Sequence, residues 1–332
     1  MIRPLFALAL SLVIALYATP LLRAAAVRFG IVDRPDGRLK RQEAPVPYLG
    51  GIAIYLSFLL ALTATHRFDS IELLGLLLAG AIVVMLGLID DLGVLTPGVK
   101  LAGQVVAVLT LINSSIYIKL YFLPGWLAIV LSFLWLLAIT NAFNIIDVMD
   151  GLAAGVASVA ALVLMLVAAF NGRDTYAVVL AAMAGALAGF LRYNFAPARI
   201  YMGDAGSMFV GLMLGALAMN NTYTRSNLVA SVAPVVILGV PVFDMLFVMY
   251  VRFRRGLPVM KGSPDHFALR LRKWRLSTRQ TVLLSYAATL LLGLLAIAMM
   301  LGSAQVALVI LGLIVTLALA IGILLKRIDM SL

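Results

Sequence analysis

The chain contains no cysteine and only two histidines among its 332 residues. Without cysteine there is no disulfide framework, no thiol nucleophile and no cysteine-ligated metal, and the redox compartment cannot be inferred. Charged residues are also scarce, at 12%, whereas 64% of the residues are apolar. Together with a mean hydropathy of +1.11, this composition excludes a soluble globular protein.

In place of charge the chain has a series of long apolar runs. Each can cross the roughly 30 Å of bilayer hydrocarbon as a helix, whereas a membrane β-barrel would show short alternating segments. The sequence therefore predicts an all-α, polytopic membrane helix bundle with 10–11 transmembrane helices in one domain, residues 1–332. Pro241 removes a helix hydrogen bond, which predicts a kink or a break in the ninth span. The eleven predicted spans are 4–22, 48–65, 71–89, 101–118, 122–141, 152–170, 175–191, 206–221, 228–250, 281–301 and 304–325.

Basic residues gather on one side of these predicted spans. If the spans alternate in direction, all but five of the 25 Lys and Arg residues fall in one set of loops. The positive-inside rule makes that set cytoplasmic, with the N-terminus outside and the C-terminus inside. The same rule explains the net charge of +11 without a nucleic-acid partner. The acidic clusters share these loops, which are about residues 23–47, 90–100, 142–151, 192–205 and 252–280.

Four polar residues recur every three positions where the fifth span meets its edge. On a helix such a spacing drifts by only about 60° per step, so the four would form one stripe. One of them alone would more often be a helix cap or a solvated end. Four together, next to small residues, favour a binding surface. They are Asn141, Asn144, Asp147 and Asp150.

Two adjacent acids, Asp90 and Asp91, end the apolar third span. Acids at a helix C-terminus oppose the macrodipole, and their mutual repulsion would be relieved by a divalent cation or a neighbouring lysine. Lys100 could serve the pair or simply mark the cytoplasmic side, and for the acids themselves a solvated loop is an equally good reading.

A third polar group, Gly203 to Ser207, lies where the eighth span begins. The free N–H groups at a helix start attract an anion, and Asp204 could hold the metal that accompanies a phosphate. The alternative is that Asp204 simply caps the helix. Tyr201 could stack on a nucleobase, although an aromatic residue at this level is more often part of the interfacial belt.

The loop 252–279 is amphipathic and strongly basic. It could lie along an anionic leaflet or clamp a diphosphate, although for most of its basic residues a role in topology alone is the better interpretation. Carboxylates for Mg²⁺, amides and basic residues for phosphate, and an aromatic ring for a base therefore meet at one face. That combination predicts a phosphoryl-transfer site for a nucleoside diphosphate.

The order of these motifs resembles the polyprenyl-phosphate N-acetylhexosamine-1-phosphate transferases (glycosyltransferase family 4), most of all the bacterial UDP-GlcNAc:undecaprenyl-phosphate enzymes. The resemblance covers about residues 33–280. It implies a Mg²⁺-dependent transfer, with Mn²⁺ as an alternative ion, of a sugar 1-phosphate from a UDP-sugar to undecaprenyl phosphate in the bacterial cytoplasmic membrane. The matching stretches are "PVPYLGG", "GLIDDLGVLTPGVKLAGQ", "NAFNIIDVMDGLA", "NFAPARIYMGDAGSMFVG", "PVFDMLFVMYVRFRRG" and "GSPDHFALRL".

The resemblance also implies roles for individual residues. The acids given a catalytic role are Asp90, Asp91, Asp147 and Asp150, and the metal ligands are Asp204 and Asp91. Asp244 also falls on a position typical of the family. The residues implied or expected to bind substrate are Lys40, Asn141, Asn144, Asn194, Tyr201, His266, Arg270 and Arg272.

The chain departs from the family pattern at three places. Val148 replaces a usual glycine, Gln42 replaces a common histidine, and the last cytoplasmic loop lacks the His-rich run. Arg270 and Arg272 can still bind phosphate as fixed cations. The departures leave open which hexosamine is transferred and which polymer pathway is served, and the sequence also leaves a homodimer open.

Two other classes of function remain as alternatives. A secondary transporter would place its coupling carboxylates near the membrane midplane, where only Asp244 is expected, so transport is disfavoured. A non-catalytic relative that binds the lipid carrier is suggested only by the altered His-rich run, whereas all the acidic motifs are present.

Overall fold

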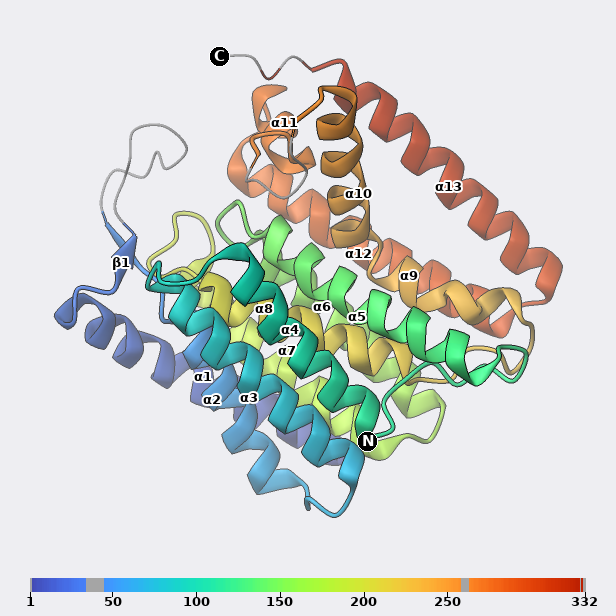
Figure 1. The fold of residues 1–332 in the computed structure, drawn as a ribbon, viewed down its shortest axis with the longest axis horizontal. Helices are drawn as coiled ribbons and strands as arrows, with labels where there is room; N and C mark the ends of the chain where they lie inside the picture. Colours follow the sequence, from blue (N-terminus) through green and yellow to red (C-terminus); the bar gives the residue numbers. More distant parts are fainter. Residues whose placement is uncertain (1, 34–44, 258–262, 329, 331–332) are drawn as a thin grey trace.

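The computed structural model describes residues 2–33, 45–257, 263–328 and 330, and these residues form an almost entirely helical bundle (Figure 1). Each of the eleven apolar segments predicted from the sequence contains a helix, and the predicted ends differ by a few residues. The helices are α1 (Ile2–Arg28), α2 (Gly50–Thr65), α3 (Ile71–Asp91), α4 (Pro97–Asn113), α5 (Gly125–Ile146), α6 (Leu152–Phe170), α7 (Asp174–Asn194), α8 (Gly203–Met219), the 3₁₀ turn η1 (Val229–Val232), α9 (Ala233–Ile237), α10 (Gly239–Arg254), α11 (Phe267–Lys273), α12 (Thr278–Leu301) and α13 (Ala304–Lys326).

Seven of the described helices are long and apolar enough to cross a membrane, and the count is eight if the bent pair around Leu238 forms one span. The other three predicted spans correspond to α2, α4 and α8, which are apolar but only 16 or 17 residues long. The protein is therefore an all-helical, multi-pass membrane protein. The figure of 10 or 11 spans depends on whether these shorter helices cross the bilayer too.

The ninth predicted span is broken in the middle, as expected from its prolines. The chain turns by 80° between the segment Val229–Ile237 and α10. The break lies at Leu238, three residues before Pro241. Pro241 is thus in the first turn of α10, where a missing N–H costs no helix hydrogen bond, so the proline begins the new helix.

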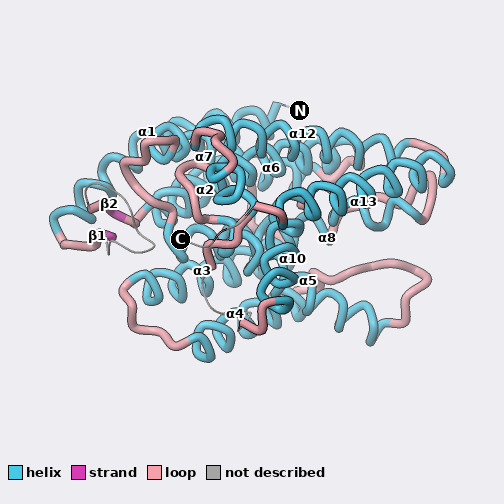
Figure 2. The backbone as a smooth tube through the Cα atoms, turned by 90° about the horizontal axis from the view of Figure 1, so that it is seen from above, coloured by secondary structure: helices cyan, strands magenta, loops and turns pink. Residues whose placement is uncertain are grey.

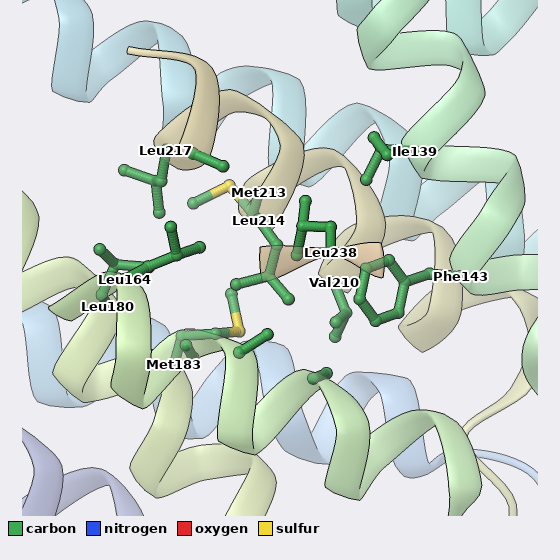
Figure 3. Packing of buried hydrophobic residues seen from close by; sticks show 14 of the residues in the cluster. Ile139, Phe143, Leu164, Leu180, Met183, Val210, Met213, Leu214, Leu217 and Leu238 are labelled. Carbon is green, nitrogen blue, oxygen red and sulfur yellow. The ribbon is translucent and has the colours of Figure 1, made fainter. Parts of the chain in front are cut away.

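The centre of the bundle consists of α6, α7 and α8, whose side chains are almost all buried. Leu164 of α6, Met183 of α7 and Leu214 of α8 meet there (Figure 3). Around this core α1 packs on α7, and α12 packs on α6 (Figure 2). In contrast, only Ala307 and Leu325 of α13 are buried, as expected for a helix with most of its surface in lipid.

A feature that hydropathy did not predict is a small antiparallel pair of strands, β1 (Val32–Asp33) and β2 (Val46–Pro47). It closes the long loop between α1 and α2. The polar loops of the chain meet at two opposite ends of the bundle. The first, which we call the acidic end, holds Asp91, Asp150 and Asp204, and the opposite end holds Glu72 and Lys119.

Candidate functional site

The site is built around the first turn of α8, which is pressed between α2 and α3. A Cβ atom added to Gly51 of α2 would lie 2.2 Å from the backbone nitrogen of Gly206. One added to Gly87 of α3 would lie 2.3 Å from the nitrogen of Ala205. Only glycine allows the backbones to approach this closely, so these two positions set the depth at which Asp204 enters the site.

The segment before α8 is held by backbone hydrogen bonds. Gly50 N–H donates to the carbonyl oxygen of Tyr201 at 3.1 Å, and Gly51 N–H donates to that of Met202 at 2.8 Å. Tyr201 N–H in turn donates to Pro47 at 2.8 Å. The "PVPYLGG" stretch, one of those that carry the family resemblance, therefore fixes the position of Tyr201.

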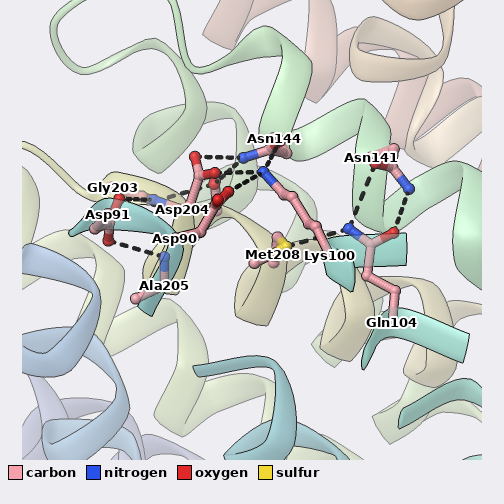
Figure 4. Close-up of polar contacts among 11 residues, drawn as sticks. Asp90, Asp91, Lys100, Gln104, Asn141, Asn144, Gly203, Asp204, Ala205 and Met208 are labelled. Carbon is pink, nitrogen blue, oxygen red and sulfur yellow. Dashed lines mark hydrogen bonds and ion pairs between the residues drawn. The ribbon is translucent and has the colours of Figure 1, made fainter. Parts of the chain in front are cut away.

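Asp91 caps α8 from a neighbouring helix. Its two carboxylate oxygens accept hydrogen bonds from the backbone N–H groups of Asp204, at 2.7 Å, and Ala205, at 3.2 Å (Figure 4). The start of α8 does attract an anion, as predicted, but the anion is a side chain of the protein itself. These two amides are therefore not available to a phosphate.

Lys100 joins the remaining acids of this cluster. Its ammonium group lies 2.8 Å from Asp90 Oδ2, forms a short ion pair with Asp204 and donates to Asn144 Oδ1 at 3.1 Å (Figure 4). The Asn144 side-chain amide also donates to Asp204 Oδ1 at 2.8 Å. Of the predicted acid pair, Lys100 therefore serves Asp90 alone, and it joins this acid to Asp204 rather than to Asp91. Two carboxylates already converge on one cation here.

Two residues of the cluster had no role assigned from the sequence, although Ser207 ends the polar group that begins at Gly203. Gln104 exchanges side-chain hydrogen bonds with Asn141, and Ser207 accepts one from Asn144 at 2.9 Å. Each lies one helical turn after a residue of the cluster, Gln104 after Lys100 and Ser207 after Gly203. That four-residue spacing was the signal by which they could have been found.

The predicted helical stripe is only half helical. Asn141 and Asn144 lie on one face of α5, but this helix ends at Ile146, and Asp147 and Asp150 belong to the turn that follows. The single stripe of four is therefore wrong. Gly151, with a φ of +77°, completes the turn and allows α6 to begin at Leu152.

Asp147 differs from its neighbours because it has no hydrogen bond or ion pair to any other described residue. Burial, together with the negative charges of Asp204, Asp91 and Asp150, raises the pKa of its carboxyl group to about 7. The group is therefore close to the acidic cluster, and its carboxylate oxygens have no partner among the described residues.

The turn after α5 is tied to the segment that carries Tyr201. Asp150 Oδ2 accepts from Ala198 N–H at 2.9 Å, and Asn194 bonds both Gly151 N–H and the Ile200 carbonyl. Asn194 is buried and positions these two segments, so the structure does not place it at an open substrate surface. The phenol of Tyr201 is partly buried, and burial with the nearby carboxylates raises its pKa to about 12.

In the basic loop, Arg270 does not have the position expected of a residue that binds substrate phosphate. Arg270 is fully buried and donates to Asp265 and to the carbonyls of Leu325 and Ile328, so it fastens α11 to the end of α13. Its predicted binding of substrate phosphate is therefore not supported by its position, because burial and these bonds separate it from any open surface.

Four other predicted residues have different outcomes. His266 Nδ1 lies 2.7 Å from Asp244 Oδ2, and none of its described bonds reaches the acidic cluster. Asp244, expected deep in the bundle, is buried in this pair. Arg272 is exposed on α11, and Lys40 lies outside the described residues.

The acidic end can supply part of a metal site. Among the described residues no group of three or more His, Cys, Asp or Glu side chains has the arrangement of a complete one. However, Asp90 and Asp204 both contact the Lys100 ammonium, so a cation already bridges them. Mg²⁺ is commonly bound by one or two carboxylates together with substrate phosphates, and this donor set fits such a partial shell.

Comparison with known proteins gives consistent results. The family model described as glycosyl transferase family 4 matches residues 73–222. A Bacillus subtilis (strain 168) protein named "Probable undecaprenyl-phosphate N-acetylglucosaminyl 1-phosphate transferase" is 32% identical over 294 residues, covering 86% of this chain and 82% of the relative.

Two further relatives match a similar part of the chain. A decaprenyl-phosphate N-acetylglucosaminephosphotransferase of Mycolicibacterium smegmatis is 32% identical, covering 82% of this chain and 76% of the relative. An undecaprenyl-phosphate alpha-N-acetylglucosaminyl 1-phosphate transferase of Salmonella typhi is 28% identical, covering 82% and 78%. All three names describe the same class of reaction. The region that the family model matches includes α5, α8 and nearly all of α3.

Proposed function

The chain belongs to glycosyl transferase family 4, and from this premise we propose that it transfers N-acetylglucosamine 1-phosphate from UDP-N-acetylglucosamine to undecaprenyl phosphate, with release of UMP. The observation that carries the proposal is the acidic end itself. There Asp90 and Asp204 share one cation, and Asp147 stands beside them with no described partner. Such a cluster is suited to a substrate that brings phosphate oxygens and a metal ion.

The reaction is a direct displacement at phosphorus. A phosphate oxygen of the lipid forms a bond to the β-phosphorus of the UDP-sugar, and the bond from that phosphorus to the oxygen bridging the two phosphates breaks. The electron pair leaves with UMP. A phosphate monoester has a second pKa of about 6 and is largely ionised at neutral pH, so no strong general base is required.

The main task of the protein is to bring two anionic phosphates together. Lys100 supplies a fixed positive charge, and the Asn144 amide holds the Asp204 carboxylate in place. Asp204 and Asp90 would hold Mg²⁺, and Asp91 fixes the start of α8 that carries Asp204. When bound, the ion would neutralise charge on the phosphates.

The uridine end of the donor is assigned to the segment around Tyr201. Its ring lies close enough to Asp150 and Asp147 for their charges to raise its pKa. A ring held on a backbone paired with Pro47 and Gly50 offers a preorganised surface for stacking on uracil. Asp150 and Asn194 hold that segment from the other side.

The proposal includes an orientation and a cellular place. The excess of basic residues in the loops of the acidic end supports a cytoplasmic position for this end, with the N-terminus outside. A bacterial inner-membrane enzyme with this orientation would meet a soluble UDP-sugar and a lipid phosphate at the same surface. It would begin the lipid-linked assembly of a cell-envelope polysaccharide.

The test is UMP release by the purified protein with Mg²⁺ and undecaprenyl phosphate, across a panel of UDP-N-acetylhexosamines and UDP-hexoses. We expect release that requires the lipid and is fastest with UDP-N-acetylglucosamine. Lipid-dependent release that is faster with another sugar would retain the reaction and replace the donor. No release with any donor, from folded protein that still binds UDP-sugar, would overturn the assignment as a transferase.

A further inference from the structure

A second polar hollow lies at the same end of the bundle but outside the acidic site. It has a volume of about 530 Å³ and lies between the end of α7, the loop that follows it and the start of α12. Three arginines line it, namely Arg192, Arg199 and Arg279. None of the described residues that line it is acidic, so this hollow, which we call the arginine pocket, is strongly positive.

The arginines of this pocket have unused hydrogen-bonding capacity. All three are exposed. Arg279 donates one hydrogen bond from Nε to the Ala196 carbonyl at 3.1 Å, whereas the side chains of Arg192 and Arg199 make no hydrogen bond or ion pair to another described residue. Each guanidinium carries five N–H donors in a rigid fork that suits phosphate. Three such groups around one hollow repel one another, and a bound anion relieves that repulsion.

The walls of the pocket continue into apolar surface. Ala188 and Leu191 of α7 line it, and Leu283, one turn after Arg279 on α12, is 54% exposed. α1 borders the same loop, because Arg23 donates to the Arg199 carbonyl at 3.0 Å, and the preceding residues of α1 include the exposed Leu21. Both α1 and α12 are candidate membrane spans. A ligand here can therefore place a charged group among the arginines and a hydrocarbon chain along the helices.

We propose that the arginine pocket binds the phosphate of an anionic phospholipid headgroup, with the acyl chains lying against α12 and α1. Basic pockets between helices at the cytoplasmic surface are suited to such headgroups. The pocket adjoins the acidic site, because the loop that forms its wall also donates the Ala198 N–H to Asp150. The residues that line the pocket are different from those of the acidic site. The lipid is thus distinct from the proposed acceptor, and its binding does not depend on transferase activity.

The test measures retention of lipid by the purified protein in neutral detergent. Native mass spectrometry would compare binding of phosphatidylglycerol and phosphatidylcholine with the same acyl chains. The pocket variant combines Arg192→Gln, Arg199→Gln and Arg279→Gln. The control variant combines Arg28→Gln, Arg254→Gln and Arg327→Gln, which removes the same charge from exposed positions that do not line the pocket.

We expect the wild type and the control variant to prefer phosphatidylglycerol by about tenfold or more, since each basic residue near a lipid headgroup adds severalfold to affinity. The pocket variant should lose this preference. If the triple variant is not stable, Arg192→Gln alone, which breaks no described bond, should still reduce the preference severalfold.

Three results would overturn the proposal. The first is an unchanged preference in the folded pocket variant. The second is displacement of phosphatidylglycerol by glycerol 3-phosphate at equal concentration, which would make the pocket a site for soluble anions. The third is displacement of phosphatidylglycerol from the wild type by undecaprenyl phosphate, at equal concentration and where phosphatidylcholine has no effect, which would make the pocket part of the acceptor site.

Discussion

The two ends of the bundle use similar side chains in opposite ways. At the opposite end, Glu72 accepts a hydrogen bond from the Tyr176 hydroxyl at 2.8 Å and another from Lys119 at 3.3 Å. Asn220 donates to the same hydroxyl, and Arg173 lies 5.0 Å from the Tyr176 ring. One acid therefore meets two donors, and the network fastens four separate segments of the chain.

At the acidic end the balance is reversed. Lys100 is shared between Asp90 and Asp204, and Asp147 has no described partner. A protein selected only for stability would pair or remove such acids, because uncompensated carboxylates near one another oppose folding. The contrast indicates that the opposite end stabilises the fold, whereas the acidic end keeps unfavourable charge, as expected if the proposed substrate and metal ion bind there.

The largest effect should come from removing one acid from the shared cluster. Asp204→Asn keeps the size of the side chain but removes the charge that Lys100 and Asn144 hold in place. We expect UMP release to fall by about 100-fold to 1,000-fold, as for loss of one preorganised electrostatic group. The rate is measured with saturating donor and lipid. Glu72→Gln, the matched change at the opposite end, should leave the rate of the folded protein within about twofold, and an equal loss in both variants would contradict the contrast.

A smaller effect should follow when the shared lysine is removed. Lys100→Gln leaves Asp90 and Asp204 without their cation, so the unfolding free energy without metal should fall by about 1 to 3 kcal/mol, less than for a fully buried pair because these groups are partly exposed. Mg²⁺ should restore more stability to this variant than to the wild type if the ion can bind between the same carboxylates. The measurement is thermal unfolding in detergent with chelator and then with Mg²⁺.

Lys119→Gln provides the control for that experiment. Lys119 pairs with Glu72 at 3.3 Å, but its side chain is 45% exposed. Removing an exposed pair changes stability by less than about 1 kcal/mol, and Mg²⁺ should have no special effect. Equal Mg²⁺ rescue of both lysine variants would mean that the ion acts elsewhere.

A third variant reverses the comparison by affecting stability without affecting activity. Tyr176→Phe removes the hydroxyl that donates to Glu72 and accepts from the buried Asn220. Loss of these bonds should lower the unfolding free energy by about 1 to 2 kcal/mol, since a buried polar group loses its partner. UMP release per folded molecule should not change. A loss of activity with unchanged stability would show that the opposite end takes part in the reaction.

The comparison also explains what could be predicted from the sequence. The helices were predictable because each apolar run marks its own span, and the acids of the acidic end were predictable as a group because alternating spans bring their loops together. The opposite end was missed, since Glu72, Tyr176 and Asn220 are single polar residues on three different segments. Nothing in their local spacing indicates that they meet.

Within the acidic end, the errors have the same physical origin. That Asp91 caps α8 depends on how deeply α8 is inserted beside Gly87, which no local pattern reports. The end of α5 at Ile146 was hidden because a three-residue spacing fits both a helix and the turn that follows it. The buried role of Arg270 depends on the end of α13, which lies more than fifty residues away along the chain.

The smallest predicted effect concerns pH and distinguishes the unpaired acid from the paired ones. The pKa of Asp147 is raised to about 7, whereas the unfolded chain releases this proton near the ordinary value of 3.8. Between these values the folded protein holds a proton that the unfolded chain has lost, so stability falls as pH rises from about 4 to 7 and then levels off. Each pKa unit corresponds to about 1.4 kcal/mol, and because water reaches this partly buried group, we expect a loss of only about 1 to 2 kcal/mol between pH 5 and pH 8.

Asp147→Asn should remove that part of the pH dependence and make the metal-free protein more stable than the wild type at pH 8. Thermal unfolding of both proteins between pH 5 and pH 8, with chelator present, measures the difference. If the stability of the Asp147→Asn variant falls with pH as steeply as that of the wild type, ionised Asp147 does not destabilise the folded protein. In that case the acidic end would be as well compensated as the opposite end, and the contrast between them would not indicate function.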